Sequence, residues 1–260
     1  MRLIPAPEIV PDDMASGLAL VWFALGLVGT AVGAVAFLGA GWTEPDPWKR
    51  RFYVYSTAAA GAMAGAYVLA VLGIGRLPIG GGDAATPVFW ARAIAWTGIA
   101  RVFLFGLGRF AGAEPSTTQR AAALGAGVAV ASLLAALLPP GPLSMLGWVA
   151  AGACLVGVLA LLFGPIGSSA SRRHRSVVAT YGRVRATLAV ALAATVGVGV
   201  AGVAGLDVLP RGATLPLLLA VDVGGVVLPG FFLCRSRAVL HWARPEDRSE
   251  PDDAAETTAN

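Results

Sequence analysis

Seven long apolar stretches, each close to the length of a membrane span, restrict the fold of this chain more than any other feature. They cover roughly residues 16–40, 52–75, 88–110, 121–138, 143–166, 181–206 and 212–235. A helix of about 20 residues crosses the hydrocarbon core of a bilayer, and only helices or closed barrels satisfy their backbone groups there. We therefore expect an all-α membrane protein, a bundle of seven transmembrane helices.

The composition agrees with this expectation. Hydrophobic side chains make up 57% of the chain and charged ones only 13%, whereas a soluble domain is about 25% charged. Too little polar surface is left to coat a water-soluble globule. Intrinsic disorder, nucleic-acid binding and a disulfide scaffold are therefore excluded as primary interpretations.

Lysine and arginine are divided unequally between the two sets of loops, which predicts an orientation. The poorer set and adjoining helix ends contain Arg2, Arg76, Arg92 and Arg211, and the richer set contains Lys49, Arg50, Arg51, Arg109, Arg120, Arg172, Arg173, Arg175, Arg183, Arg185, Arg235, Arg237, Arg244 and Arg248. The positive-inside rule places the N-terminus outside and the C-terminus in the cytoplasm of a multi-pass protein of the cell membrane. We expect a membrane domain over residues 1–245 and an acidic, disordered cytoplasmic tail over residues 246–260.

Few charged side chains fall inside the apolar stretches, and each one is a candidate functional group because a charge at the bilayer centre costs at least ~2.5 kcal/mol. Asp222 is the one carboxylate well inside a stretch, while Arg92 and Arg101 lie at the outer end and near the middle of the third. At 100° per residue, Arg92 shares a helix face with Trp96, and Arg101 lies on the opposite side. We expect Asp222 to neutralise Arg92 and to accept a hydrogen bond from Tyr67.

Two interpretations of this polar group stay open. A static ion pair that fixes helix register is favoured over a polar cavity inherited from a ligand or ion path. For Arg101 the sequence offers no partner, and packing against the carbonyls of neighbouring helices is favoured over a functional role. Gly224-Gly225 and Pro229 predict a loosened or kinked helix near Asp222. No metal-ligand cluster and no catalytic nucleophile or acid–base pair is found, so we expect neither a metal site nor an enzyme.

Several motifs carry a family resemblance. They are Arg50-Arg51-Phe52-Tyr53, Tyr67, the stretch from Thr86 to Trp96 with Trp90-Ala91-Arg92 inside it, Leu219-Ala220-Val221-Asp222-Val223, and Arg235-Ser236-Arg237-Ala238-Val239. In these positions the chain resembles the microbial rhodopsins, and is closest to the archaeal bacteriorhodopsin type. The resemblance covers essentially the whole chain. The resemblance implies a seven-helix fold. In the family, proteins of this fold transport ions in response to light, which they absorb through covalently bound retinal.

The chain departs from this pattern where retinal is attached. In the family, a lysine one helical turn past the aspartate of the last helix forms a Schiff base with retinal, and the corresponding residue here is Val226. Lys49 is the only lysine in the sequence, and an imine with retinal requires a primary amine. We therefore expect no covalent retinal. A retinoid or carotenoid bound without a covalent bond is a weaker alternative.

Other departures concern proton transfer and the pocket wall. By the resemblance, Ala95 stands in place of the proton acceptor and Gly106 in place of the proton donor. The aromatic residues and proline of the family's sixth helix are replaced by Leu192, Thr195, Val196 and Gly199. Of the polar and aromatic pocket lining, we expect only Tyr67, Arg92, Trp96 and Asp222 to remain.

Three functions are compatible with these expectations, in order of preference. The first is a non-photochemical membrane protein that interacts with or regulates a partner, such as another rhodopsin-family protein or a second copy. The second is a transporter or channel for ions, or for a small anion or lipid, that uses the cavity around Arg92 and Asp222. The third is a photoreceptor with a non-covalent retinoid or carotenoid. The bilayer is an implied partner of all three, and nucleic acid of none.

Overall fold

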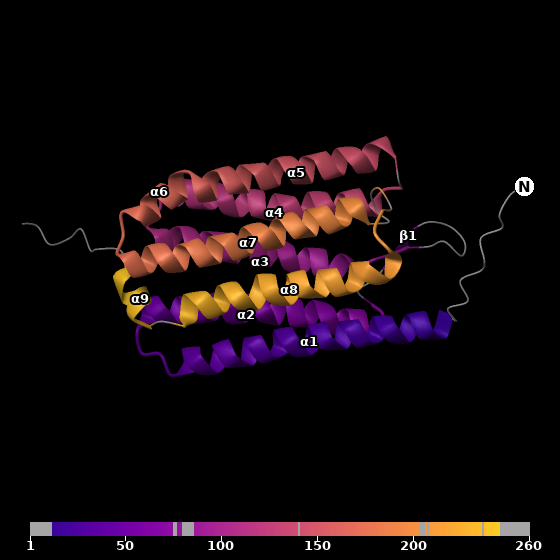
Figure 1. The fold of residues 1–260 in the computed structure, drawn as a ribbon. Coiled ribbons are helices and arrows are strands. Elements are labelled where there is room, and N and C mark those ends of the chain that lie inside the picture. The colour runs from indigo at the N-terminus through magenta and orange to yellow at the C-terminus, as the bar shows by residue number, and fades with distance from the viewer. Residues whose placement is uncertain are drawn as a thin grey trace, which may run out of the picture.

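The structure is a computed structural model, and it describes residues 12–74, 77–79, 86–139, 141–202, 206, 208–235 and 237–244. The elements, in chain order, are α1 (Asp12–Trp42), α2 (Pro47–Val71), β1 (Leu77–Ile79), β2 (Thr86–Val88), α3 (Trp90–Ala111), α4 (Pro115–Leu137), α5 (Pro142–Phe163), α6 (Pro165–Ser171), α7 (Arg175–Ala201), α8 (Arg211–Cys234) and α9 (Arg237–Trp242) (Figure 1). Among the described residues, seven helices are long and apolar enough to cross a membrane, which confirms the predicted bundle.

The second, fourth and sixth spans begin earlier than predicted. Their helices start at Pro47, Pro115 and Arg175, five or six residues before the apolar stretches. The first turns contain charged or polar residues, so hydrophobicity did not reveal them, yet a side-chain cap or a proline in the first turn stabilises them. The Asp46 side chain accepts a hydrogen bond from the backbone N–H of Trp48 at 2.9 Å, and proline occupies the first turn of α2 and α4.

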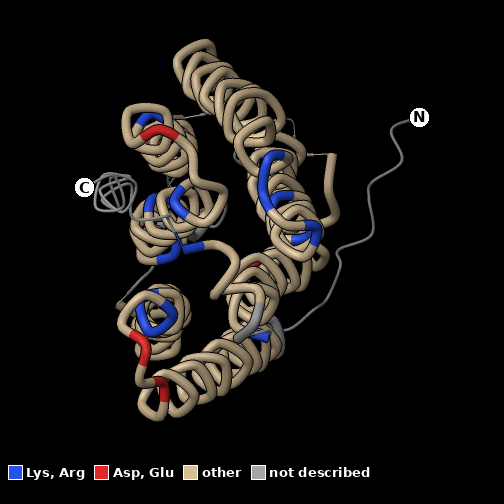
Figure 2. Tube along the Cα trace, turned by 90° about the vertical axis from the view of Figure 1, so that its left-hand side faces the viewer, with Lys and Arg blue, Asp and Glu red and all other residues tan. Residues whose placement is uncertain are grey.

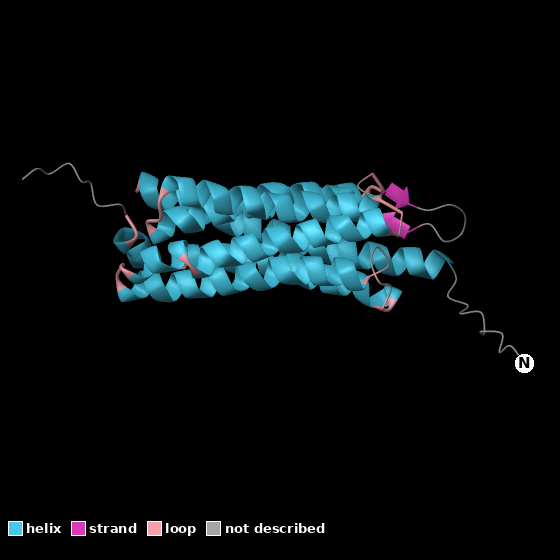
Figure 3. Ribbon diagram, turned by 90° about the horizontal axis from the view of Figure 1, so that it is seen from above, coloured by secondary structure: helices cyan, strands magenta, loops and turns pink. Residues whose placement is uncertain are grey.

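A short hairpin joins α2 to α3 at the end of the bundle opposite α9 (Figure 1), where its two strands are drawn in magenta in Figure 3. Its strands β1 and β2 are antiparallel, with Leu77 opposite Val88. The sequence gives no sign of these strands, because strands of three residues are too short to show a pattern of alternating apolar residues.

Each long helix packs against its neighbour in the sequence, and α8 closes the bundle by packing against α1, α2 and α7. Aromatic side chains fill the interior, among them Phe52, Trp96, Phe103 and Phe110, each at most 1% exposed. Leucine and valine side chains on α1 and α5 face outward, for example Val35 and Val149. Such an apolar exterior is suited to contact with lipid.

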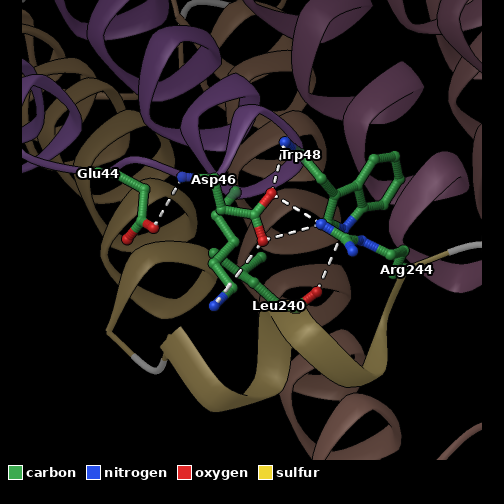
Figure 4. Close-up of polar contacts among 6 residues, drawn as sticks. Glu44, Asp46, Trp48, Leu240 and Arg244 are labelled. Atoms are coloured by element: carbon green, nitrogen blue, oxygen red, sulfur yellow. Dashed lines mark hydrogen bonds and ion pairs between the residues drawn. The ribbon is translucent and has the colours of Figure 1, made fainter.

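The basic residues gather at the end of the bundle where α9 lies, and Figure 2 looks onto that end. There α9 is fixed to the start of α2: the Trp48 indole donates to the Leu240 carbonyl at 3.1 Å, and Arg244 contacts both Asp46 oxygens at 2.9 and 3.0 Å (Figure 4). The predicted inequality between the two ends is therefore present in the structure, and the cytoplasmic assignment of the basic end stays a prediction. The predicted tail, residues 246–260, lies outside the described residues.

Candidate functional site

Asp222, on α8, lies in the interior of the bundle with no exposed surface. Its Oδ2 accepts a hydrogen bond from the Tyr67 hydroxyl of α2, and its Oδ1 accepts one from the Trp96 indole of α3, both at 2.7 Å. Three helices therefore meet at one carboxylate. The hydrogen bond from Tyr67 was predicted from the sequence. The one from Trp96 was not, although the sequence did place Trp96 on the same face as Arg92.

Arg92 completes the group. Its Nε lies 2.9 and 2.8 Å from the two carboxylate oxygens of Asp222, and its Nη2 lies 2.7 Å from Oδ1. Nη2 also donates to the Thr195 hydroxyl of α7 at 3.4 Å. The predicted ion pair is thus present. The carboxylate receives donors from three side chains, and such charge-assisted hydrogen bonds hold it in one position.

Glycine allows α8 to approach this group closely. A Cβ at Gly225 would lie 2.6 Å from the Ala191 Cβ and 2.9 Å from the Trp96 ring, both too short for a real contact. Any side chain there would displace the Trp96 ring from Asp222. The predicted loosening near Asp222 does not interrupt α8, which stays helical through Gly224 and Gly225 and contains Pro229 within it.

The residues that the resemblance assigns to the retinal-attachment and proton-transfer positions are buried, and none of them has an ionisable side chain. Val226 has no exposed surface, and Ala95 and Gly106 are buried on α3. The only lysine was expected in the loop before the second span, but it lies in the first turn of α2. There its Nζ is 3.9 Å from an Asp46 oxygen, at the basic end of the bundle. An amine in that place cannot reach the side chains around Asp222, so the described interior does not fit a Schiff base with retinal.

The Trp148 indole occupies the space beside the sixth span. A Cβ at Gly199 on α7 would overlap the Trp148 ring of α5, and Trp148 is buried. Leu192, Thr195 and Val196 are buried on the same helix. The space beside Gly199, one of the positions that the resemblance assigns to a large side chain of this helix, is therefore taken by a ring from α5.

Arg101 corrects one prediction. It was expected to pack between helices, but its side chain is exposed on the outer face of α3. It forms no hydrogen bond or ion pair with any residue that the structure describes. It therefore lies apart from Arg92 and Asp222 and shares no cavity with them. No cluster of potential metal ligands occurs among the described residues.

Comparison with known proteins gives consistent matches. The sequence profile described as "Bacteriorhodopsin-like protein" matches residues 18–236. The bacteriorhodopsin of Halobacterium salinarum is 28% identical over 240 residues, which cover 92% of this chain and 91% of that protein. Bacteriorhodopsin-II of Haloarcula marismortui is 28% identical over 221 residues, covering 85% of this chain and 88% of that protein.

Solved structures show the same fold. Cyanorhodopsin from the cyanobacterium Calothrix superposes with a TM-score of 0.81 at 24% identity, covering 87% of this chain and 98% of that one. A rhodopsin from Coccomyxa subellipsoidea, described as a light-driven proton pump, superposes with a TM-score of 0.78 at 21% identity, covering 84% and 96%.

Proposed function

This chain belongs to the bacteriorhodopsin-like protein family, and from that premise we propose that it is a seven-helix membrane protein without covalent retinal that acts by binding another membrane protein. Its relatives include light-driven proton pumps, such as the Coccomyxa rhodopsin. Three features support a different role for this chain, and they concern retinal attachment, proton transfer and the outer surface.

Retinal attachment lacks its nucleophile. Val226 stands where the family resemblance places the lysine, and Lys49 is the only lysine in the sequence. The imine chemistry requires a primary amine within reach of the aldehyde. Because the Trp148 ring takes the space beside Gly199, that part of the interior is closed to a retinoid or carotenoid held without a bond.

Proton transfer lacks its relay. A pump needs carboxylates that gain and lose protons on either side of the chromophore. Here Ala95 and Gly106 occupy the corresponding positions on α3, and Asp222 is bound to Arg92, Tyr67 and Trp96. A carboxylate paired in this way is a structural link between helices. This arrangement also disfavours a transport path through the group.

The position of Arg101 is the observation that supports binding to another membrane protein. It is exposed near the middle of α3, which is the depth of the bilayer centre for a spanning helix. A lipid-facing arginine at that depth costs at least ~2.5 kcal/mol. A carboxylate supplied by another membrane helix would offset this cost. Among the described residues, Asp222 is the only carboxylate inside a span and it is buried, so a second copy offers no such partner.

One experiment tests the loss of covalent retinal. The purified protein is incubated with retinal, then examined by visible spectroscopy before and after hydroxylamine, and by intact mass after borohydride reduction. We expect no red-shifted band and no adduct beyond surface labelling of Lys49, which the Lys49→Arg variant removes, and of any free α-amino group. A hydroxylamine-sensitive visible band in the unmodified protein would contradict the proposal.

A second experiment tests the partner. The wild-type protein, Arg101→Leu and the control Arg120→Leu are purified from native membranes in mild detergent, and the co-purified proteins are compared. Arg120 is also exposed, but it lies in the second turn of α4 and not at the middle of a span. We expect a membrane protein with an intramembrane carboxylate that is lost only with Arg101→Leu. Identical co-purification from all three, or none from any, would refute it.

A further inference from the structure

A cavity of about 420 Å³ opens at the basic end of the bundle, where α7 lies beside the end of α8 and the start of α9. It is lined by Ser176, Ala179, Thr180, Arg183, Phe232, Arg235 and Val239. Phe232 comes ten residues after Asp222 on α8, so at 1.5 Å per residue the cavity lies about 15 Å along the helix from the Asp222 group. It is therefore a separate site, and a ligand bound there is independent of the proposed function.

The polar lining of this cavity is cationic and rich in hydrogen-bond donors. Arg183 and Arg235 are both exposed, and neither forms an ion pair with any residue in the described part of the chain. Ser176 and Thr180 add two hydroxyl groups, and no carboxylate is among the lining residues. Two guanidinium groups beside hydroxyl donors match the oxygen atoms of a phosphate group, which accept several hydrogen bonds at once.

The other lining residues and the depth of the cavity point to the source of the phosphate. Arg235 comes directly after the end of α8, and Arg183 lies in the third turn of α7. The cavity therefore lies where a spanning helix passes the headgroup layer. Phe232, Val239 and Ala179 form an apolar wall on which an acyl chain can pack. Basic pockets between membrane helices at such a depth bind the headgroups of anionic lipids.

We propose that this α7–α8 pocket binds the phosphate of an anionic membrane lipid, with Arg183 and Arg235 holding the phosphate oxygens and Thr180 donating a hydrogen bond. The lipid's chains then run along Phe232 toward the membrane. Bound in this way, the lipid joins the sixth and seventh spans next to α9 and ties the basic end of the bundle to the headgroup layer.

The test uses the full chain in nanodiscs of phosphatidylcholine with a minor share of phosphatidylglycerol, and native mass spectrometry counts the retained phosphatidylglycerol. We expect the double variant Arg183→Gln/Arg235→Gln to bind this lipid at least about tenfold more weakly than the wild type, since each cation at the headgroup layer contributes to the attraction of an anionic lipid. Arg50→Gln/Arg120→Gln removes the same charge from exposed positions at the same end and is expected to retain wild-type binding. Arg183→Lys/Arg235→Lys is expected to keep most of it.

The outcomes separate the alternatives. Equal lipid retention by the wild type and the glutamine double variant overturns the proposal, as does an equal loss in the control. If the glutamine double variant fails to fold, the lysine double variant and Thr180→Val test the proposal in its place. Unchanged lipid binding by Thr180→Val together with complete loss of binding by the lysine double variant would contradict a phosphate site. A second arm titrates inorganic phosphate into protein in pure phosphatidylcholine nanodiscs. If inorganic phosphate binds saturably and as strongly as the lipid does, the proposal that the bound phosphate group belongs to a lipid is refuted.

Discussion

The Arg92 guanidinium of α3 and the Asp222 carboxylate of α8, 130 residues apart in sequence, meet in the interior at 2.7 to 2.9 Å. Each of the two charges would be costly without the other, because both are buried: Asp222 has no exposed surface and Arg92 is 8% exposed. The pair fixes how the third and last spans lie relative to one another. Tyr67 and Trp96 strengthen the link by donating to the same carboxylate.

Removing one charge of this pair should destabilise the bundle strongly. Asp222→Asn leaves Arg92 buried without a counter-charge, and we expect a loss of about 3 to 5 kcal/mol in the free energy of unfolding. Denaturation in mixed micelles measures this loss. The control Glu114→Gln, an exposed carboxylate, should change it by less than about 0.5 kcal/mol. Asp222→Asn combined with Arg92→Gln should lose less than the sum of the single variants, and simple additivity would argue against a coupled pair.

Removing the tyrosine hydroxyl should have a smaller effect. Tyr67→Phe keeps the ring and deletes one hydrogen bond to an ionised acceptor, which corresponds to about 1.5 to 3 kcal/mol. The same unfolding measurement should therefore rank it between Glu114→Gln and Asp222→Asn. The control is Thr187→Val, which deletes a hydroxyl whose hydrogen bond to the Arg183 carbonyl is exposed. A loss in Tyr67→Phe no greater than in Thr187→Val would show that the hydroxyl does not support Asp222.

The sequence predicted the seven spans and the meeting of Arg92 with Asp222, for physical reasons. Span length depends on bilayer thickness, and a single buried carboxylate leaves a buried arginine with one available counter-charge. The sequence also placed Trp96 on the face of Arg92, but the direction of an indole N–H depends on how helices are rotated in the folded bundle. That rotation is set by packing, such as the contact of Gly225 with Trp96.

Arg101 and Trp148 show what the sequence could not predict. Helix periodicity placed Arg101 opposite Arg92, but whether that side meets a neighbouring helix or lipid depends on the arrangement of the whole bundle. The Trp148 ring fills the space beside Gly199, and this pairing of α5 with α7 has no local signal. The early starts of α2, α4 and α7 were missed because they do not depend on apolar residues: side-chain caps stabilise α2 and α7, and a proline in the first turn favours α4.

The contacts of Asp46 at the basic end of the bundle predict that the free energy of unfolding depends on pH. Burial raises its pKa and is the largest single effect, but the Trp48 N–H and the nearby Arg244 and Lys49 together outweigh it, so its pKa lies below the usual value of 3.8. The stabilisation is therefore complete above about pH 4 and is lost as the pH falls through the lowered pKa. Asp46→Asn keeps a capping side chain but loses the charge, so we expect it to lose less than about 1 kcal/mol at pH 7, since Arg244 is exposed.

Unfolding of the wild type and Asp46→Asn, measured from pH 7 to pH 3, checks this prediction. The difference between the two should be constant near neutrality and shrink as the wild-type carboxylate is protonated. Asp46→Ala removes the cap as well and should lose about 1 kcal/mol more than Asp46→Asn at every pH. A difference that grows toward low pH would mean that the pKa of Asp46 is raised in the folded state, contrary to its contacts.

The contact of Gly199 with Trp148 yields a prediction with a matched control on the same helix. Gly199→Ala places a methyl group inside the Trp148 ring, whereas Gly197→Ala meets nothing within 4 Å. We expect Gly199→Ala to destabilise the protein by about 1 to 3 kcal/mol, the usual effect of overpacking. Gly197→Ala should be neutral or stabilising, because alanine favours helix over glycine. In the background of Trp148→Leu, which replaces the indole with a smaller side chain, the cost of Gly199→Ala should largely disappear. An equal cost in both backgrounds would show that the indole does not occupy this space, and the interior would then no longer disfavour a bound retinoid.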